Sequence, residues 1–213
     1  MNRVLRYCFF LVVVRPLVLV VLGINIRHRD RLPAAGPAII VANHNSHLDT
    51  LALMTLFPQR LLKCLRPVAA ADYFFSRKGL AWFATHIIGI IPLSRKLHHS
   101  EGDPLKGCHE ALDRGDILII FPEGSRGEPE HLATFKTGVA HLAERHPETP
   151  VIPVFLHGLG KALPKGESLL VPFFCDIFVG AKLAWPGGRQ EFMAGLDGAI
   201  RSLAKEGKLP DWE

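Results

Sequence analysis

Short apolar runs alternate along this chain with longer segments in which apolar residues recur at helical spacing. The runs predict buried strands at residues 38–42, 67–70, 89–93, 117–121, 151–155 and 173–179. The longer segments predict helices near residues 49–57, 79–88, 101–114, 136–145 and 189–205. This alternation indicates an α/β fold, with a mostly parallel or mixed central sheet covered by helices on both faces. Within the fifth run, Pro153 favours an edge position or a bulge.

The most apolar segment, residues 7–24, lies ahead of this alternating region. Its eighteen residues barely reach the roughly 20 that a spanning helix needs. Arg15 interrupts the segment, and Pro16 favours a break into two short helices with Pro16 starting the second. Cations flank the segment at Arg3, Arg6, Arg27, Arg29 and Arg31. We therefore expect an N-terminal anchor that lies in the membrane plane or re-enters it, with a span, a cleaved signal peptide and a buried helix as alternatives.

This interpretation divides the 213 residues into a membrane-associating segment, residues 1–30, and an α/β domain, residues 31–213. The formal charge of +5 favours anionic partners. Because the basic residues form no dense tract, we expect membrane lipids rather than nucleic acid. A short basic stretch at Arg60, Lys63 and Arg66 predicts a solvated face, with lipid headgroups as the alternative contact. The widely spaced cysteines, Cys8, Cys64, Cys108 and Cys175, show no ligand pattern, so no metal is expected.

The candidate chemistry begins where the first predicted strand ends, at Asn43-His44-Asn45-Ser46-His47-Leu48-Asp49. An imidazole there can act as a general base, and a turn can fold the carboxylate of Asp49 back to orient it. Spacing alone is weak evidence, since His98 and Asp103 repeat it in a polar loop. The alternatives are that His44 is a capping residue and that Asp49 caps the next helix. We assign His47 a structural role.

Polar residues follow other predicted strands as well. Ser94-Arg95 comes after residues 89–93, and Pro122-Glu123-Gly124-Ser125-Arg126 comes after residues 117–121, with Lys136 a short loop beyond. Ligands of open α/β sheets bind beyond the carboxyl ends of the strands, so these groups are expected on one rim. An imidazole, a carboxylate and three cations together predict proton abstraction beside an anion site.

These blocks, in this order, resemble the glycerolipid acyltransferases of the PlsC type, which are the 1-acylglycerol-3-phosphate acyltransferases and their relatives. The resemblance rests on Asn43-His44-x4-Asp49, Gly89-x4-Ser94-Arg95, Phe121-Pro122-Glu123-Gly124-Ser125-Arg126 and Val151-Ile152-Pro153. It spans about residues 30–160. In the second block, Pro92 and Ser94 stand where phosphatidate-forming members often have Phe and Asp, which leaves the acceptor open.

The resemblance implies a role for each matching residue. His44 would be the general base and Asp49 its orienting partner. Arg95, Glu123, Gly124 and Arg126 would hold the glycerol phosphate, Lys136 would add a phosphate contact, and Ser125 completes the predicted substrate-binding set. Backbone amides near Gly124 are candidates for stabilising the oxyanion. No cofactor is expected, because acyl-CoA or acyl-carrier protein enters as co-substrate.

The sequence thus predicts a membrane-associated acyltransferase on the cytoplasmic face of the inner membrane. It would transfer a fatty acyl group to a lysophospholipid hydroxyl, with 1-acylglycerol-3-phosphate the favoured acceptor and phosphatidic acid the product. One alternative is another lysolipid acceptor, such as a lysophosphatidylethanolamine or a lyso-ornithine lipid. Another is a non-catalytic lipid-binding protein of the same fold. A serine hydrolase is disfavoured, because the chain has no Gly-x-Ser-x-Gly turn.

Overall fold

A seven-stranded sheet organises the computed structural model, which describes residues 2–71, 78–93, 103–127, 132–163, 171 and 173–207. The strand order is β1-β7-β6-β2-β5-β3-β4, and every neighbouring pair is parallel except β6 and β7. The strands are β1 (Ile24–Arg27), β2 (Ala38–Ala42), β3 (Leu65–Ala70), β4 (Ile91–Leu93), β5 (Ile117–Ile120), β6 (Val151–His157) and β7 (Cys175–Val179). The predicted α/β class with a mixed sheet is therefore confirmed.

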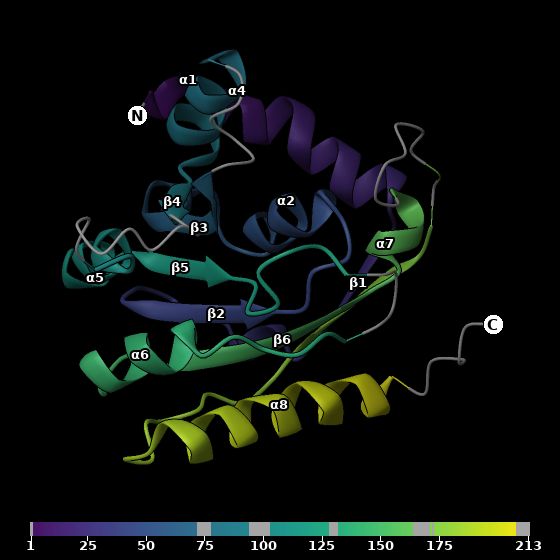
Figure 1. The fold of residues 1–213 in the computed structure, drawn as a ribbon. Coiled ribbons are helices and arrows are strands. Elements are labelled where there is room, and N and C mark those ends of the chain that lie inside the picture. The colour runs from purple at the N-terminus through teal and green to yellow at the C-terminus, as the bar shows by residue number, and fades with distance from the viewer. Residues whose placement is uncertain are drawn as a thin grey trace.

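Helices cover both faces of this sheet (Figure 1). The helices α1 (Arg3–Phe9) and α2 (Leu48–Thr55) lie on one side, and α6 (Gly138–Arg145) and α8 (Arg189–Glu206) lie on the other. The remaining helices are α4 (Lys78–Phe83), α5 (Lys106–Asp113) and α7 (Leu159–Ala162), with π-helical segments η1 (Phe10–Val14), η2 (Leu17–Val21) and η5 (Ala84–Ile88) and 3₁₀ segments η3 (Arg29–Arg31) and η4 (Gln59–Cys64).

Strand β2 shows why the sheet needs cover on both faces. All five of its side chains are buried. Ala38, Ile40 and Ala42 join one hydrophobic cluster, whereas Ile39 and Val41 join the cluster on the opposite face. Alternate residues of a strand point to opposite faces, so an unbroken apolar run is stable only between two layers of helices.

The N-terminal segment differs from its prediction in one respect. Residues 3–21 are helical without a break, because Arg15 and Pro16 keep helical backbone between the π-helical segments η1 and η2. A π-helical turn accommodates a proline that lacks an amide donor. The charge of Arg15 is also accommodated, since its Nη2 donates to the carbonyl oxygen of Phe57 at 3.3 Å. The predicted break at Pro16 is therefore wrong.

This helical segment has two apolar faces with different surroundings. Phe10, Val14, Val18 and Leu22 are buried in the core beneath it. The opposite side exposes large apolar side chains, namely Val4, Leu5, Tyr7, Leu11, Val12, Val13, Leu19 and Val20. Across the described ranges, no helix has both the length and the apolarity required to cross a bilayer.

Strand β6 lies inside the sheet between β2 and β7, so the edge position that Pro153 suggested is excluded, whereas the alternative of a bulge is confirmed. Pro153 is opposite Val41 of β2. On the other side, its carbonyl oxygen accepts from the amide of Gly180, directly after β7 ends, at 2.8 Å. The pairing then resumes between Val151 and Leu183, so two residues of the neighbouring segment, 181 and 182, lie opposite Ile152 alone.

Candidate active site

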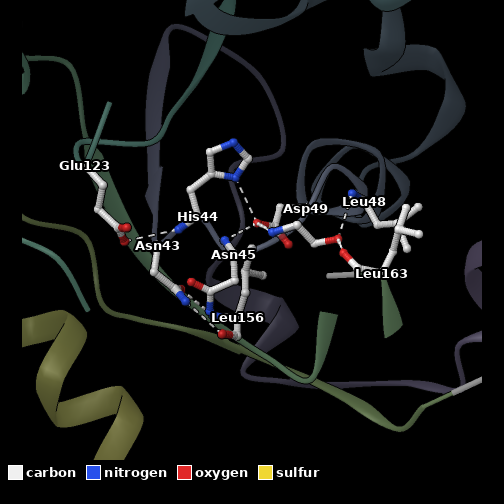
Figure 2. Close-up of polar contacts among 9 residues, drawn as sticks. Asn43, His44, Asn45, Leu48, Asp49, Glu123, Leu156 and Leu163 are labelled. Atoms are coloured by element: carbon white, nitrogen blue, oxygen red, sulfur yellow. Dashed lines mark hydrogen bonds and ion pairs between the residues drawn. The ribbon is translucent and has the colours of Figure 1, made fainter. Parts of the chain in front are cut away.

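The imidazole of His44 and the carboxylate of Asp49 meet at the carboxyl end of β2. His44 Nδ1 lies 2.9 Å from Asp49 Oδ2. The same carboxylate oxygen accepts the backbone amides of Asn45 at 2.7 Å and Ser46 at 2.8 Å (Figure 2). Asp49 is fully buried, whereas the His44 side chain is 19 % exposed. A carboxylate at Nδ1 favours the tautomer with the proton on that nitrogen, which leaves the Nε2 lone pair available as a base.

The backbone on either side of His44 is fixed by two further contacts. The side-chain amide of Asn43 donates to the carbonyl oxygen of Leu156 at 2.8 Å and accepts the Leu156 amide at 2.7 Å. The carbonyl oxygen of His44 accepts from the amide of Gly127 at 3.0 Å. The imidazole is thus held by neighbouring parts of the sheet, as a base in a preorganised site requires.

Glu123 lies behind His44 and contacts its backbone rather than its ring. It follows β5, the parallel neighbour of β2, and its Oε1 accepts the backbone amide of His44 at 3.2 Å. Only 5 % of the residue is exposed. Burial raises the pKa of Glu123 from 4.5 to about 7, the hydrogen bond from His44 opposes that rise, and the nearby charge of Asp49 adds to it. In this position Glu123 sets the backbone that carries the imidazole.

The raised pKa of Glu123 predicts a pH-dependent cost to stability. The folded protein binds more protons at this group than the unfolded chain, so its contribution falls as the pH rises from 4.5 to about 7. Glu123→Gln keeps an acceptor for His44 but removes the ionisation. The variant should gain stability relative to the native protein between about pH 5 and pH 8, by on the order of 2–3 kcal/mol. Urea unfolding at both pH values measures the difference, and Glu148→Gln, at an exposed position, is the matched control. Equal pH profiles for the native protein and Glu123→Gln would contradict the assignment.

The turn after β5 brings a ring and a cation to the imidazole. The ring of Phe121 stacks on that of His44 with centroids 4.1 Å apart and planes inclined by 19°. Gly124 has a φ of +73°, and an added Cβ would lie 2.5 Å from Lys136 Nζ. The turn therefore requires glycine both for its backbone and for the close approach of the lysine. The amide of Gly124 donates to the carbonyl oxygen of Phe121 at 3.1 Å, so among the amides near Gly124 that the sequence suggested as oxyanion donors this one is already engaged.

A cavity of about 1130 Å³ connects these groups. Its polar lining includes His44, His47, Gly124, Ser125, Arg126 and Lys136, together with Thr50, Asp103, Thr137 and His141. Its apolar part is lined by side chains of α4, η5, β4, β5, α5 and α6, among them Leu80, Phe83, Ile88, Leu93, Leu105 and Leu142. A cavity lined by both charged and apolar side chains fits an amphiphilic ligand.

The predicted site residues thus fall into three groups. His44, Gly124, Ser125, Arg126 and Lys136 line one cavity. Asp49 and Glu123 support His44 from behind, through its ring and its amide. Arg95 lies outside the described residues, as does His98 of the comparison pair. The other member of that pair, Asp103, also lines the cavity, and its carboxylate lies 3.4 Å from His109 and 3.8 Å from Arg145.

Three residues have positions that the sequence did not indicate. Phe121 forms the stacking surface for His44. His47 lies on the cavity wall, and burial lowers its pKa, with the charge of Arg126 acting in the same direction. Ser46 is fully buried and its hydroxyl donates to the carbonyl oxygen of Leu163 at 3.0 Å, so it is not placed to act as a nucleophile. The sequence signal for Phe121 was an aromatic residue at the end of the apolar run 117–121, directly before the Pro122-Glu123-Gly124 turn.

A family model described as Acyltransferase matches residues 23–157, which include every block on which the resemblance rests. The chain belongs to the acyltransferase family. Among curated members of this family, the chloroplastic 1-acyl-sn-glycerol-3-phosphate acyltransferase LPAT1 of Arabidopsis thaliana is 33 % identical over 152 residues, covering 68 % of this chain and 39 % of the relative. The mouse 1-acyl-sn-glycerol-3-phosphate acyltransferase alpha is 28 % identical over 180 residues, covering 84 % and 61 %.

The fold is shared with a solved structure of a family member. The 1-acyl-sn-glycerophosphate acyltransferase PlsC from Thermotoga maritima superimposes with a TM-score of 0.71 at 21 % sequence identity, covering 89 % of this chain and 74 % of that one. The chain spans between about two fifths and three fifths of the length of the two curated relatives above. The predicted membership of the PlsC-type acyltransferases is confirmed.

Proposed function

We propose that this protein transfers a fatty acyl group from a thioester donor to the hydroxyl of a lysophospholipid, with 1-acylglycerol-3-phosphate as acceptor and phosphatidic acid as product. The observation that carries the proposal is the oriented imidazole of His44 on the wall of a cavity that also presents Arg126 and Lys136. The names of the relatives support the choice of acceptor, because both curated proteins are called 1-acyl-sn-glycerol-3-phosphate acyltransferases.

In the proposed reaction, Nε2 of His44 takes the proton of the acceptor hydroxyl as its oxygen attacks the thioester carbonyl carbon. The hydrogen bond from Nδ1 to Asp49 stabilises the imidazolium that forms. The tetrahedral intermediate then breaks its carbon–sulfur bond, and His44 returns the proton to the departing thiolate. Thioester and hydroxyl become ester and thiol. Acyl-CoA and acyl-carrier protein both supply such a thioester.

We propose that the cations bind the acceptor phosphate and that the apolar wall holds an acyl chain. Arg126 offers a bidentate fork to phosphate oxygens, whereas Lys136 offers a point charge over Gly124. Fixing the phosphate holds the acceptor hydroxyl near His44 and lowers the entropic cost of the encounter. The exposed apolar side of the N-terminal helical segment would rest in the lipid surface that supplies the acceptor.

The direct test gives the purified protein labelled acyl-CoA or acyl-carrier protein with a panel of lysolipids. Lysophosphatidate should be converted to phosphatidic acid, and acceptors whose phosphate is esterified to ethanolamine should react more slowly, because they offer fewer phosphate oxygens to the cations. Transfer to lysophosphatidylethanolamine alone would overturn the choice of acceptor. Release of free fatty acid with no acylated product would overturn the reaction class.

Arg126→Ala should raise the KM for lysophosphatidate. Loss of a charge-assisted hydrogen bond costs about 1.5–3 kcal/mol, which corresponds to a KM increase of about 10- to 100-fold. The KM for the acyl donor should change little, because the donor does not need this phosphate contact. Initial rates over a range of each substrate separate the two, and Arg201→Ala, at an exposed position on α8, controls for the loss of one charge. An unchanged acceptor KM would remove Arg126 from the phosphate site.

A further inference from the structure

A second cavity, of about 200 Å³, lies between helix α1 and the 3₁₀ segment η4. It has no lining residue in common with the catalytic cavity. Its walls carry four positive charges, from Arg3, Arg6, Arg60 and Lys63, and no carboxylate. A concave surface with this charge balance favours an anion.

One of these cations is fixed by the fold. Arg6 is only 2 % exposed, and its Nη2 donates to the carbonyl oxygens of Leu65 at 3.0 Å and Ile88 at 2.9 Å. Burial lowers the pKa of Arg6 to about 10, and the neighbouring charge of Arg66 acts in the same direction. The charge of Asp116, which pairs with Arg66 at 3.0 Å, acts in the opposite direction, and the guanidinium stays charged at neutral pH.

A neutral donor in the same cavity lacks an acceptor among the described residues. Nε2 of Gln59 is buried and has no hydrogen-bond partner in the part of the chain that the structure describes. Buried polar atoms are nearly always paired, so an unpaired amide at a cationic cavity indicates an acceptor that binds there. An oxygen of an anion supplies this acceptor.

The surroundings of the cavity select among possible anions. Helical spacing puts Tyr7 in line with Arg3 and continues to Leu11. Tyr7 and Leu11 are 47 % and 45 % exposed, and the adjacent Val4 is 73 % exposed. An anion bound by Arg3 thus has apolar side chains beside it, which a free phosphate does not require but which acyl chains would contact.

We propose that this cavity binds the phosphate group of an anionic phospholipid, as a site separate from the catalytic cavity. Arg3, Arg60 and Lys63 contact the phosphate from its open side, while Arg6 and Gln59 contact it from within. Because Arg6 is also bonded to Ile88, which lines the catalytic cavity, a bound lipid fixes the orientation of that cavity relative to the membrane surface.

The chain offers a matched pair of variants to test this site, since Gln59 and Gln190 are its two glutamines. Gln59→Glu introduces a carboxylate that competes with lipid phosphate, whereas Gln190→Glu makes the same charge change on exposed helix α8. The probe is vesicles of phosphatidylcholine with or without phosphatidylglycerol, which is neither the substrate nor the product of the proposed reaction. Cosedimentation measures binding, and thermal melting verifies that each variant folds.

We expect phosphatidylglycerol to strengthen binding of the native protein and of Gln190→Glu by about tenfold, and Gln59→Glu to lose that gain. The double variant Arg60→Ala/Lys63→Ala should also lose the gain from phosphatidylglycerol. The double variant Lys182→Ala/Lys205→Ala removes two positive charges elsewhere and should keep that gain. His44→Ala should bind as the native protein does, so failure of the catalytic proposal leaves this test intact.

Two results would overturn the lipid site. Equal binding of Gln59→Glu and Gln190→Glu would show that only the overall surface charge matters. Stabilisation of the native protein by inorganic phosphate, without any preference for phosphatidylglycerol vesicles, would identify a site for a soluble anion instead.

Discussion

His44→Ala is expected to abolish acyl transfer while the protein stays folded. The imidazole is partly exposed, lies on the cavity wall and supplies the one nitrogen that the proposed reaction needs as a base. General-base catalysis contributes about 10²–10⁴-fold, so kcat should fall by roughly that factor. The KM for lysophosphatidate should change little, because the phosphate is held by other side chains. Product formation from labelled acyl-CoA measures the loss, and circular dichroism verifies the fold.

The control for this variant is His28→Ala. His28 Nε2 lies 2.7 Å from Glu206 Oε1 at the surface, and His28 does not line the catalytic cavity. Exposed polar contacts of this kind contribute about 0–1 kcal/mol to stability, so this variant should transfer acyl groups as the native protein does. Turnover by His44→Ala at the native rate would remove His44 from the mechanism.

Asp49→Asn should reduce kcat by removing the negative charge beside Nδ1 of His44. One oxygen of Asp49, Oδ2, accepts the backbone amides of Asn45 and Ser46 and also lies 2.9 Å from Nδ1 of His44. In the variant the amide oxygen takes this position, so the imidazole keeps its proton on Nδ1, but no carboxylate stabilises the imidazolium that forms during transfer. Loss of a charge-assisted hydrogen bond costs about 1.5–3 kcal/mol, so kcat should fall by about 10- to 100-fold.

Nitrogen chemical shifts of the His44 ring distinguish this loss of charge from a structural defect. They should show the proton of the neutral imidazole on Nδ1 in both the native protein and Asp49→Asn. Asp30→Asn, at an exposed position, is the control. Native activity in Asp49→Asn would show that the charge of the carboxylate does not assist the base.

Strand β2 could be predicted to the residue, whereas strand β1 was missed. An interior parallel strand is apolar on both faces, so residues 38–42 stand out in the sequence. Ile24–Arg27 alternates partly buried and exposed side chains and pairs with β7, about 150 residues away along the chain. A short strand at an edge, next to a longer apolar segment, carries too little local signal to be separated from it.

The sequence identified residues that gather at the candidate site, but not which of them line the cavity and which lie behind it. The motif blocks identified His44, Glu123 and Arg126 together, and two of them line the cavity. The third supports the backbone of the first, because the left-handed turn at Gly124 directs neighbouring side chains to different sides of the loop. A motif gives the residue types that a turn needs, but the direction in which each side chain points depends on backbone angles that the sequence does not state.

The role of Gln59 could not be found from the sequence at all. Its cavity forms only when α1 packs near η4, and these segments lie more than fifty residues apart. The sequence indicated a basic stretch that included Arg60 and Lys63, but nothing local pairs that stretch with Arg3 and Arg6.

The helical segment at residues 3–21 belongs to the domain interior as much as to its surface. Phe10, Val14, Val18 and Leu22 fill the same hydrophobic cluster as the strands that carry the site. A membrane anchor that is joined to a domain by a linker can be deleted without unfolding the domain. This helical segment cannot, because its deletion would expose the hydrophobic core. Substitutions among the outward side chains can therefore change the surface of the protein without disturbing the core, whereas substitutions among the inward ones cannot.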